Sequence, residues 1–273
     1  MMSSFQHGTA TLHYELEGTG PDAIYICGMG SHSNDLLGLG IRQTLSAQYR
    51  LLTVDNRGSG QTLTPAGDTV TLADIADDIV AVMDEIGMKT VYLLGVSLGG
   101  MIGLTLATRY PERVIRQVIA VSSARTPENP SRSAFFLRAG HVMRVNNLPQ
   151  EYINRHYALM VLGESVFSDM PAIIEAFENA PADPLRQSLE GFDLQAHALL
   201  GYDVREALKT LTIPTLVLSS SEDLLVPPRY QDEIAALIPG AQLKRYLGGH
   251  VYMLLPHNMP QFFADILEFW AGT

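Results

Sequence analysis

The stretch Thr90–Gly100, TVYLLGVSLGG, decides the fold of this chain. Residues 90–94 form a short apolar run typical of a buried strand, and residues 100–110 have helical character up to a proline. Between them lies GVSLG, residues 95–99. Glycines on both sides of a serine let a strand and a helix approach closely, and the sharp turn exposes the serine hydroxyl, which is the pattern of a nucleophile elbow. Ser97 is therefore the candidate nucleophile.

On both sides of this stretch, apolar runs typical of strands alternate with segments of helical period. The helix predicted at 72–86 is bounded by Thr71 and Asp74, a variant of the capping box, and by Gly87, which can adopt the left-handed conformation that ends a helix. Strands are predicted at 10–17 (an opening hairpin strand), 23–27, 50–55, 114–121, 215–219 and 242–246, and further helices at 230–237 and 260–270. This alternation predicts an α/β fold with a mostly parallel central sheet flanked by helices.

Residues 125–205 differ in character from the rest of the chain. They contain prolines, no clear strand pattern and helical stretches such as 133–145. We expect a helical cap insertion here, within an α/β core made of residues 1–124 and 206–273. Arg132, Arg138 and Arg144 follow one another at steps of six residues, which turn a helix by about 600°, so they point to different sides and form no basic stripe.

Two loops near the C-terminus supply partners for the candidate nucleophile. A serine hydroxyl needs a histidine base and a carboxylate that orients the imidazole. Asp223 follows the strand predicted at 215–219, and His250 follows the strand predicted at 242–246. Because parallel strands end at one edge of the sheet, Ser97, Asp223 and His250 can meet there.

With these motifs in place, the chain resembles the α/β-hydrolase superfamily. The likeness rests on four ordered pieces: CGMG at 27–30, DNRGSG at 55–60, the elbow at Ser97, and the D-x-x-V-P and G-H loops of Asp223 and His250. By this resemblance, the backbone N–H groups of Met29 and Leu98 would form the oxyanion hole. The resemblance also implies that Asp55 and Arg57 hold their own loop by ion pairing and hydrogen bonds instead of taking part in catalysis.

Residues that contact the substrate are predicted from their type and position. His32 lies in the polar loop after Met29, and the insertion carries large apolar side chains that suit an acyl pocket. We select His32, Phe135, Phe136 and Met143 as substrate-binding residues.

Composition excludes several other classes of protein. The formal net charge is −11, from 18 basic and 29 acidic residues, so a nucleic-acid groove or an anionic membrane face is not expected. One cysteine cannot form an internal disulfide, and the histidines show no metal-binding spacing, so we expect no metal and no cofactor. The N-terminus has no signal-peptide pattern, which predicts a cytoplasmic location.

The combined prediction is a serine hydrolase that cleaves carboxylic esters of small to medium acyl groups through an acyl-enzyme intermediate. Two alternatives stay open. Residues 97–102 and 109–114 resemble 3-oxoadipate enol-lactonases, which would make the substrate a lactone. A triad also occurs in hydrolase-like small-molecule receptors, which would show slow or single-turnover hydrolysis. No sequence pattern defines the oligomeric state.

Overall fold

The central feature of the fold is one eight-stranded sheet with the strand order β1-β2-β4-β3-β5-β6-β7-β8. The computed structural model describes residues 2–126 and 132–272. Strands β1 and β2 are antiparallel to each other, β2 is antiparallel to β4, and all other neighbours are parallel. The strands are β1 (Met2–His7), β2 (Ala10–Glu17), β3 (Asp22–Ile26), β4 (Arg50–Val54), β5 (Val91–Val96), β6 (Val114–Ala120), β7 (Thr215–Ser220) and β8 (Gln242–Tyr246). The predicted α/β fold with a mostly parallel sheet is confirmed.

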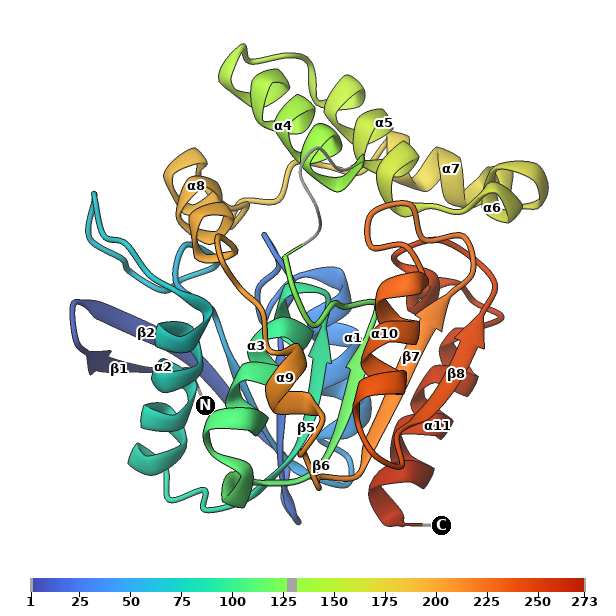
Figure 1. Cartoon of the computed structure of the whole chain (residues 1–273). Helices are drawn as coiled ribbons and strands as arrows, with labels where there is room; N and C mark the ends of the chain where they lie inside the picture. Colours follow the sequence, from blue (N-terminus) through green and yellow to red (C-terminus); the bar gives the residue numbers. More distant parts are fainter. Residues whose placement is uncertain (1, 127–131, 273) are drawn as a thin grey trace.

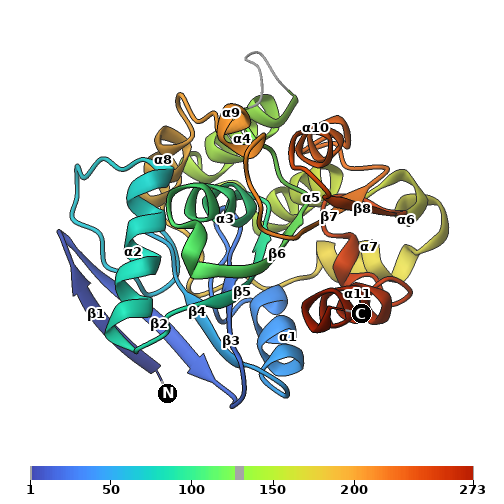
Figure 2. The same ribbon diagram turned by 60° about the horizontal axis from the view of Figure 1, so that its bottom comes forward.

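Helices cover both faces of the sheet (Figure 2). Helices α2, α3 and α10 pack against one face, and α1 and α11 pack against the other. The bounds are α1 (Leu36–Leu45), α2 (Leu72–Glu85), α3 (Leu98–Arg109), α9 (Arg205–Leu208), α10 (Arg229–Leu237) and α11 (Met259–Ala271). Central strands are therefore buried on both sides, which explains why β5 is apolar almost throughout and why every residue of β7 is buried.

The ends of α2 follow the local sequence closely. Thr71 and Asp74 form a capping box in which each side chain accepts from the other residue's backbone N–H. Gly87, just after the helix, has a φ of 72°, in the left-handed region. Both predicted boundary signals are confirmed.

Strand β1 and helix α1 are among the elements that were not predicted from sequence. Strand β1 is the hairpin partner of β2 and lies at the edge of the sheet, and its sequence MSSFQH lacks the β-branched residues that mark a strand. Helix α1 contains Gly38 and Gly40, which are weak helix formers. Its start is stabilised instead by Asp35, whose side chain accepts from the Gly38 N–H at 2.7 Å.

A layer of helices lies above the edge of the sheet at which β5, β6 and β7 end (Figure 1). We call helices α4 to α8 the cap helices: α4 (Arg132–Val145), α5 (Gln150–Val161), α6 (Glu164–Asp169), α7 (Pro171–Glu178) and α8 (Leu189–Ala198). Residues 127–131 of the predicted insertion lie outside the described residues. The helical stretch predicted at 133–145 is observed as α4.

Within residues 2–126 and 132–272, no helix has the length and apolar character needed to cross a lipid bilayer.

Candidate active site

Ser97 lies at a strained turn between β5 and α3. Its backbone has φ 57° and ψ −119°, a conformation that residues with a Cβ rarely adopt. The turn is so tight that a Cβ added at Gly99 would lie 2.0 Å from the carbonyl oxygen of Ile26, and one added at Gly95 would lie 2.5 Å from the carbonyl oxygen of Gly99. The glycines are therefore required by close packing, and the strained serine is presented at the end of the strand.

Hydrogen bonds with the end of β6 and with the segment that follows it hold the strained backbone in place. The Ser97 N–H donates to the carbonyl of Ala120 at 2.9 Å, and the Ser97 carbonyl accepts from the Ser122 hydroxyl at 2.7 Å. A backbone held on both sides retains a conformation that an isolated turn would relax.

His250 and Asp223 form a buried pair. The two atoms His250 Nδ1 and Asp223 Oδ2 are 2.7 Å apart, and the residues are 7% and 2% exposed. The other carboxylate oxygen accepts from the N–H groups of Leu225 and Val226 at 2.9 and 2.8 Å. The carboxylate is therefore fixed by its own loop, and it fixes the imidazole so that Nε2 is the free ring nitrogen.

Ser97 and His250 line the same cavity, which has a volume of about 210 Å³. No hydrogen bond joins Ser97 Oγ to His250 Nε2 in the part of the chain that the structure describes. Such bonds are commonly long in ligand-free enzymes and shorten when substrate binds. The structure thus brings together the three residues that the sequence selected, on three different loops.

The two candidate oxyanion donors are adjacent to this cavity. Met29 lines it, and Leu98 is the first residue of α3, where backbone N–H groups have no partner inside the helix. Neither amide donates to any described residue. The neighbouring Gly30 N–H differs, because it donates to Gln195 Oε1 of α8 at 3.2 Å. Both selected amides are therefore free to bind an oxyanion.

Cys27, next to this loop, is unsuited to act as a nucleophile. It is a free and fully buried cysteine, and burial raises the pKa of its thiol well above the ordinary value. A thiol with a raised pKa stays protonated at neutral pH and is inert.

The four predicted substrate-binding residues lie outside the lining of this cavity. His32 is buried, and its Nε2 atom lies 2.8 Å from Asp183 Oδ2, which ties the loop after β3 to the segment before α8. Phe135 is 75% exposed. Phe136 packs among the cap helices, and Met143 is half-buried.

Other side chains of the cap helices line the cavity instead. Leu137 and Arg144 of α4 lie one residue further along the helix than Phe136 and Met143, and one residue turns an α-helix by about 100°. Arg186 and Gln187, from the segment before α8, also line it. Sequence reasoning missed these residues because no local pattern shows which face of α4 points toward the sheet.

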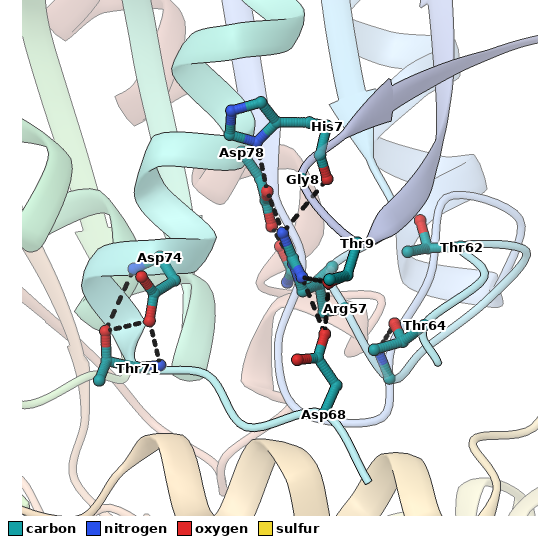
Figure 3. Close-up of polar contacts among 12 residues, drawn as sticks. His7, Gly8, Thr9, Arg57, Thr62, Thr64, Asp68, Thr71, Asp74 and Asp78 are labelled. Carbon is teal, nitrogen blue, oxygen red and sulfur yellow. Dashed lines mark hydrogen bonds and ion pairs between the residues drawn. The ribbon is translucent and has the colours of Figure 1, made fainter. Parts of the chain in front are cut away.

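The loop of Asp55 and Arg57 is held by an ion pair and hydrogen bonds, and Figure 3 shows those of Arg57. Arg57 donates to both carboxylate oxygens of Asp78, at 2.6 and 2.8 Å. Asp55 accepts from the backbone N–H groups of Ser33 and Gln61 at 2.7 and 2.9 Å. The expected ion pair and hydrogen bonds of this loop are therefore present.

Among the described residues, no group of three or more His, Cys, Asp or Glu side chains is placed to hold a metal ion.

Comparisons with known proteins agree with this architecture. The sequence model of the α/β-hydrolase fold matches residues 26–255. A protein of Caulobacter vibrioides named "Putative carbamate hydrolase RutD" is 27% identical over 263 residues, which cover 94% of this chain and 95% of that protein. A protein of the same name from Yersinia enterocolitica is 29% identical over 226 residues, covering 82% of this chain and 79% of that one.

Solved structures show the same fold. An enol-lactonase from Burkholderia xenovorans superposes with a TM-score of 0.80 at 21% identity, covering 98% of this chain and 100% of that one. A thermophilic esterase from Thermogutta terrifontis gives a TM-score of 0.82 at 22% identity, covering 100% and 98%. From the strand order, the elbow and the match over most of its length, the chain belongs to the α/β-hydrolase family.

Proposed function

We propose that this protein is a serine hydrolase that cleaves small carboxylic esters, with Ser97 as nucleophile. The observation that carries the proposal is the cavity shared by a strained, glycine-flanked serine and a histidine whose other nitrogen is bound to a buried carboxylate. In this proposal, residues 125–205 act as the cap of a core made of residues 1–124 and 206–273.

The reaction follows from the roles of these groups. His250 Nε2 accepts the proton of Ser97 Oγ as the oxygen attacks the ester carbonyl, and the N–H groups of Met29 and Leu98 stabilise the oxyanion. The intermediate collapses as His250 returns the proton to the leaving alcohol, which leaves an acyl-enzyme. Water activated by His250 then releases the acid and regenerates the serine. Asp223 holds the imidazole and stabilises its protonated form.

The cavity favours a small acyl group. Its volume of about 210 Å³ lies below the roughly 300–1,000 Å³ that is common for ligand pockets. Leu137, Tyr157 and Met160 of the cap helices supply apolar lining. A substrate with a short acyl chain fits these surroundings better than a long fatty ester.

Two related substrates use the same machinery. A lactone is a cyclic ester, and the fold similarity to an enol-lactonase keeps it as a candidate. A carbamate presents the same carbonyl to the serine, and the names of the relatives from Caulobacter and Yersinia favour it. In each case the first step is attack by Ser97, so one variant tests all three.

The test is hydrolysis of p-nitrophenyl esters from acetate to laurate, with a lactone and an aryl carbamate beside them. Ser97→Ala is expected to lower kcat by about 10⁶-fold on every accepted substrate. Ser168→Ala, at an exposed serine of α6, is the matched control and is expected to keep wild-type activity. Equal activity of Ser97→Ala and wild type would refute the proposal. Hydrolysis that stops after one turnover would favour the receptor alternative.

A further inference from the structure

Two arginines reach the cavity that contains Ser97. Arg144 comes from α4, and Arg186 comes from the segment that precedes α8. No aspartate or glutamate is among the described residues that line this cavity. The chain as a whole has 29 acidic and 18 basic residues, so its overall field repels anions. The lining of this cavity has the opposite charge balance and favours an anion.

Arg144 has unused hydrogen-bonding capacity. Its Nη2 donates to the backbone carbonyl of Gln187, while its Nε is buried and has no hydrogen-bond partner. Within the described residues Arg144 forms no ion pair. Two buried arginines differ from the half-buried Arg144: Arg42 is paired with Glu17, and Arg57 with Asp78. A buried guanidinium donor without an acceptor is costly unless a ligand supplies one.

Arg186 adds a second positive charge at the same wall. It is exposed, and its Nη1 donates to Gln150 Oε1 at 3.1 Å, a neutral partner that leaves its charge uncompensated. Like Arg144, it forms no ion pair with a residue that the structure describes. Two guanidinium groups that have no acidic partner among the described residues, and that lie beside a small cavity, are suited to bind an anionic group.

We propose that Arg144, assisted by Arg186, binds a carboxylate of the substrate, so that the preferred substrates carry both a carboxylate and the scissile ester or lactone carbonyl. This inference rests on the proposed function, because it concerns the part of the substrate that does not react. A guanidinium binds a carboxylate through two parallel N–H···O bonds, which also fixes the orientation of the ligand. A contact made equally in the ground state and the transition state acts mainly on KM.

The experiment compares an anionic and a neutral ester of similar length, monomethyl succinate and methyl pentanoate, by pH-stat titration. Wild type is expected to prefer monomethyl succinate by at least about 10-fold in kcat/KM. Arg144→Gln is expected to lower kcat/KM for monomethyl succinate by about 10- to 100-fold, mainly through KM, as for a lost hydrogen bond to a charged group. Hydrolysis of methyl pentanoate should fall much less than that of monomethyl succinate, and activity on this neutral ester also shows that the variant is folded.

Two variants on the same helix sharpen the comparison. Arg138→Gln removes an exposed charge that does not line the cavity and is expected to leave both substrates unaffected. Arg144→Lys keeps the charge without the planar fork and is expected to restore part of the preference. Equal loss on both esters in Arg144→Gln, or a wild type that hydrolyses both esters with equal kcat/KM, overturns the inference.

A binding measurement separates this inference from the proposed function. Monomethyl succinate and methyl pentanoate are titrated calorimetrically into Ser97→Ala and into Ser97→Ala/Arg144→Gln. Tighter binding of monomethyl succinate that weakens by about 10-fold or more in the double variant supports the carboxylate site even if neither ester is hydrolysed. Equal affinities in the two proteins refute the carboxylate site, whatever the activity of Ser97.

Discussion

Replacing Arg57 by methionine is expected to destabilise the fold strongly, because it leaves a buried carboxylate with little compensation. Arg57 joins the loop after β4 to α2 through two short bonds to Asp78, and it donates to Asp68 at 3.0 Å and to Thr9 at 2.9 Å (Figure 3). Asp78 is 2% exposed, and without Arg57 the side-chain partner that it keeps among the described residues is His7 Nδ1 at 2.8 Å. Removal of one partner from a buried ion pair costs about 3–5 kcal/mol, which we expect as the loss in free energy of unfolding.

Equilibrium denaturation in guanidinium chloride measures this loss, with circular dichroism and the fluorescence of the buried Trp270 as probes. A double-mutant cycle adds Asp78→Leu and Arg57→Met/Asp78→Leu. Because the double variant buries no unpaired charge at this pair, it should be at least about 2 kcal/mol more stable than the sum of the single effects predicts.

Arg109→Met is the matched control for the loss of an arginine. Arg109 pairs with Asp77 at 2.9 Å, but both side chains are substantially exposed, at 43% and 33%. An exposed pair contributes about 0–1 kcal/mol, so this variant should remain close to wild type. Equal losses in Arg57→Met and Arg109→Met, or strict additivity in the cycle, would refute the reasoning from burial.

Two further predictions concern the candidate triad and the dependence of stability on pH. Asp223→Asn should lower kcat by about 10⁴-fold with little change in KM, because an amide no longer holds His250 in the catalytic tautomer. A loss below about 10-fold on an accepted ester would show that Asp223 has no part in the mechanism. Burial raises the pKa of Asp265, whereas hydrogen bonds from Lys244 at 2.7 Å and from Tyr246 lower it. The hydrogen bonds together outweigh burial, so the pKa of Asp265 in the folded protein is below the ordinary value. A lowered folded pKa stabilises the protein above the pKa of the unfolded chain, and this stabilisation is lost as the pH falls through the folded value. Asp265→Asn should therefore be less stable than wild type at pH 7, with a difference that shrinks below about pH 4; a constant difference from pH 7 to pH 3 would contradict this.

Much of the core could be predicted from sequence because its signals are local. The elbow requires glycines within two residues of Ser97, and α2 begins at the capping box of Thr71 and ends before Gly87. Asp223 and His250 could be paired because each follows a parallel strand, and parallel strands end at a common edge.

The order of the strands and the lining of the cavity depend on contacts between distant segments. Strand β1 is defined by its pairing with β2, because its own residues have weak strand preference. By contrast, the sequence alone determined the elbow, the alternation of strands and helices, and the identity of the three candidate catalytic residues, because their signals are local.

Only the tertiary structure decided which cap residues face Ser97. The helical pattern of α4 permits several faces to point toward the sheet, and about 100° of rotation per residue separates Phe136 from Leu137 and Met143 from Arg144. The choice among these faces is made by packing against α5, the next helix along the chain, and against α8, which lies far away in the sequence. Neighbours along the chain determine that a residue is helical, whereas neighbours in space determine which side of the helix faces the core. For Arg144, the packing of α4 places the side chain in the lining of the cavity that contains Ser97.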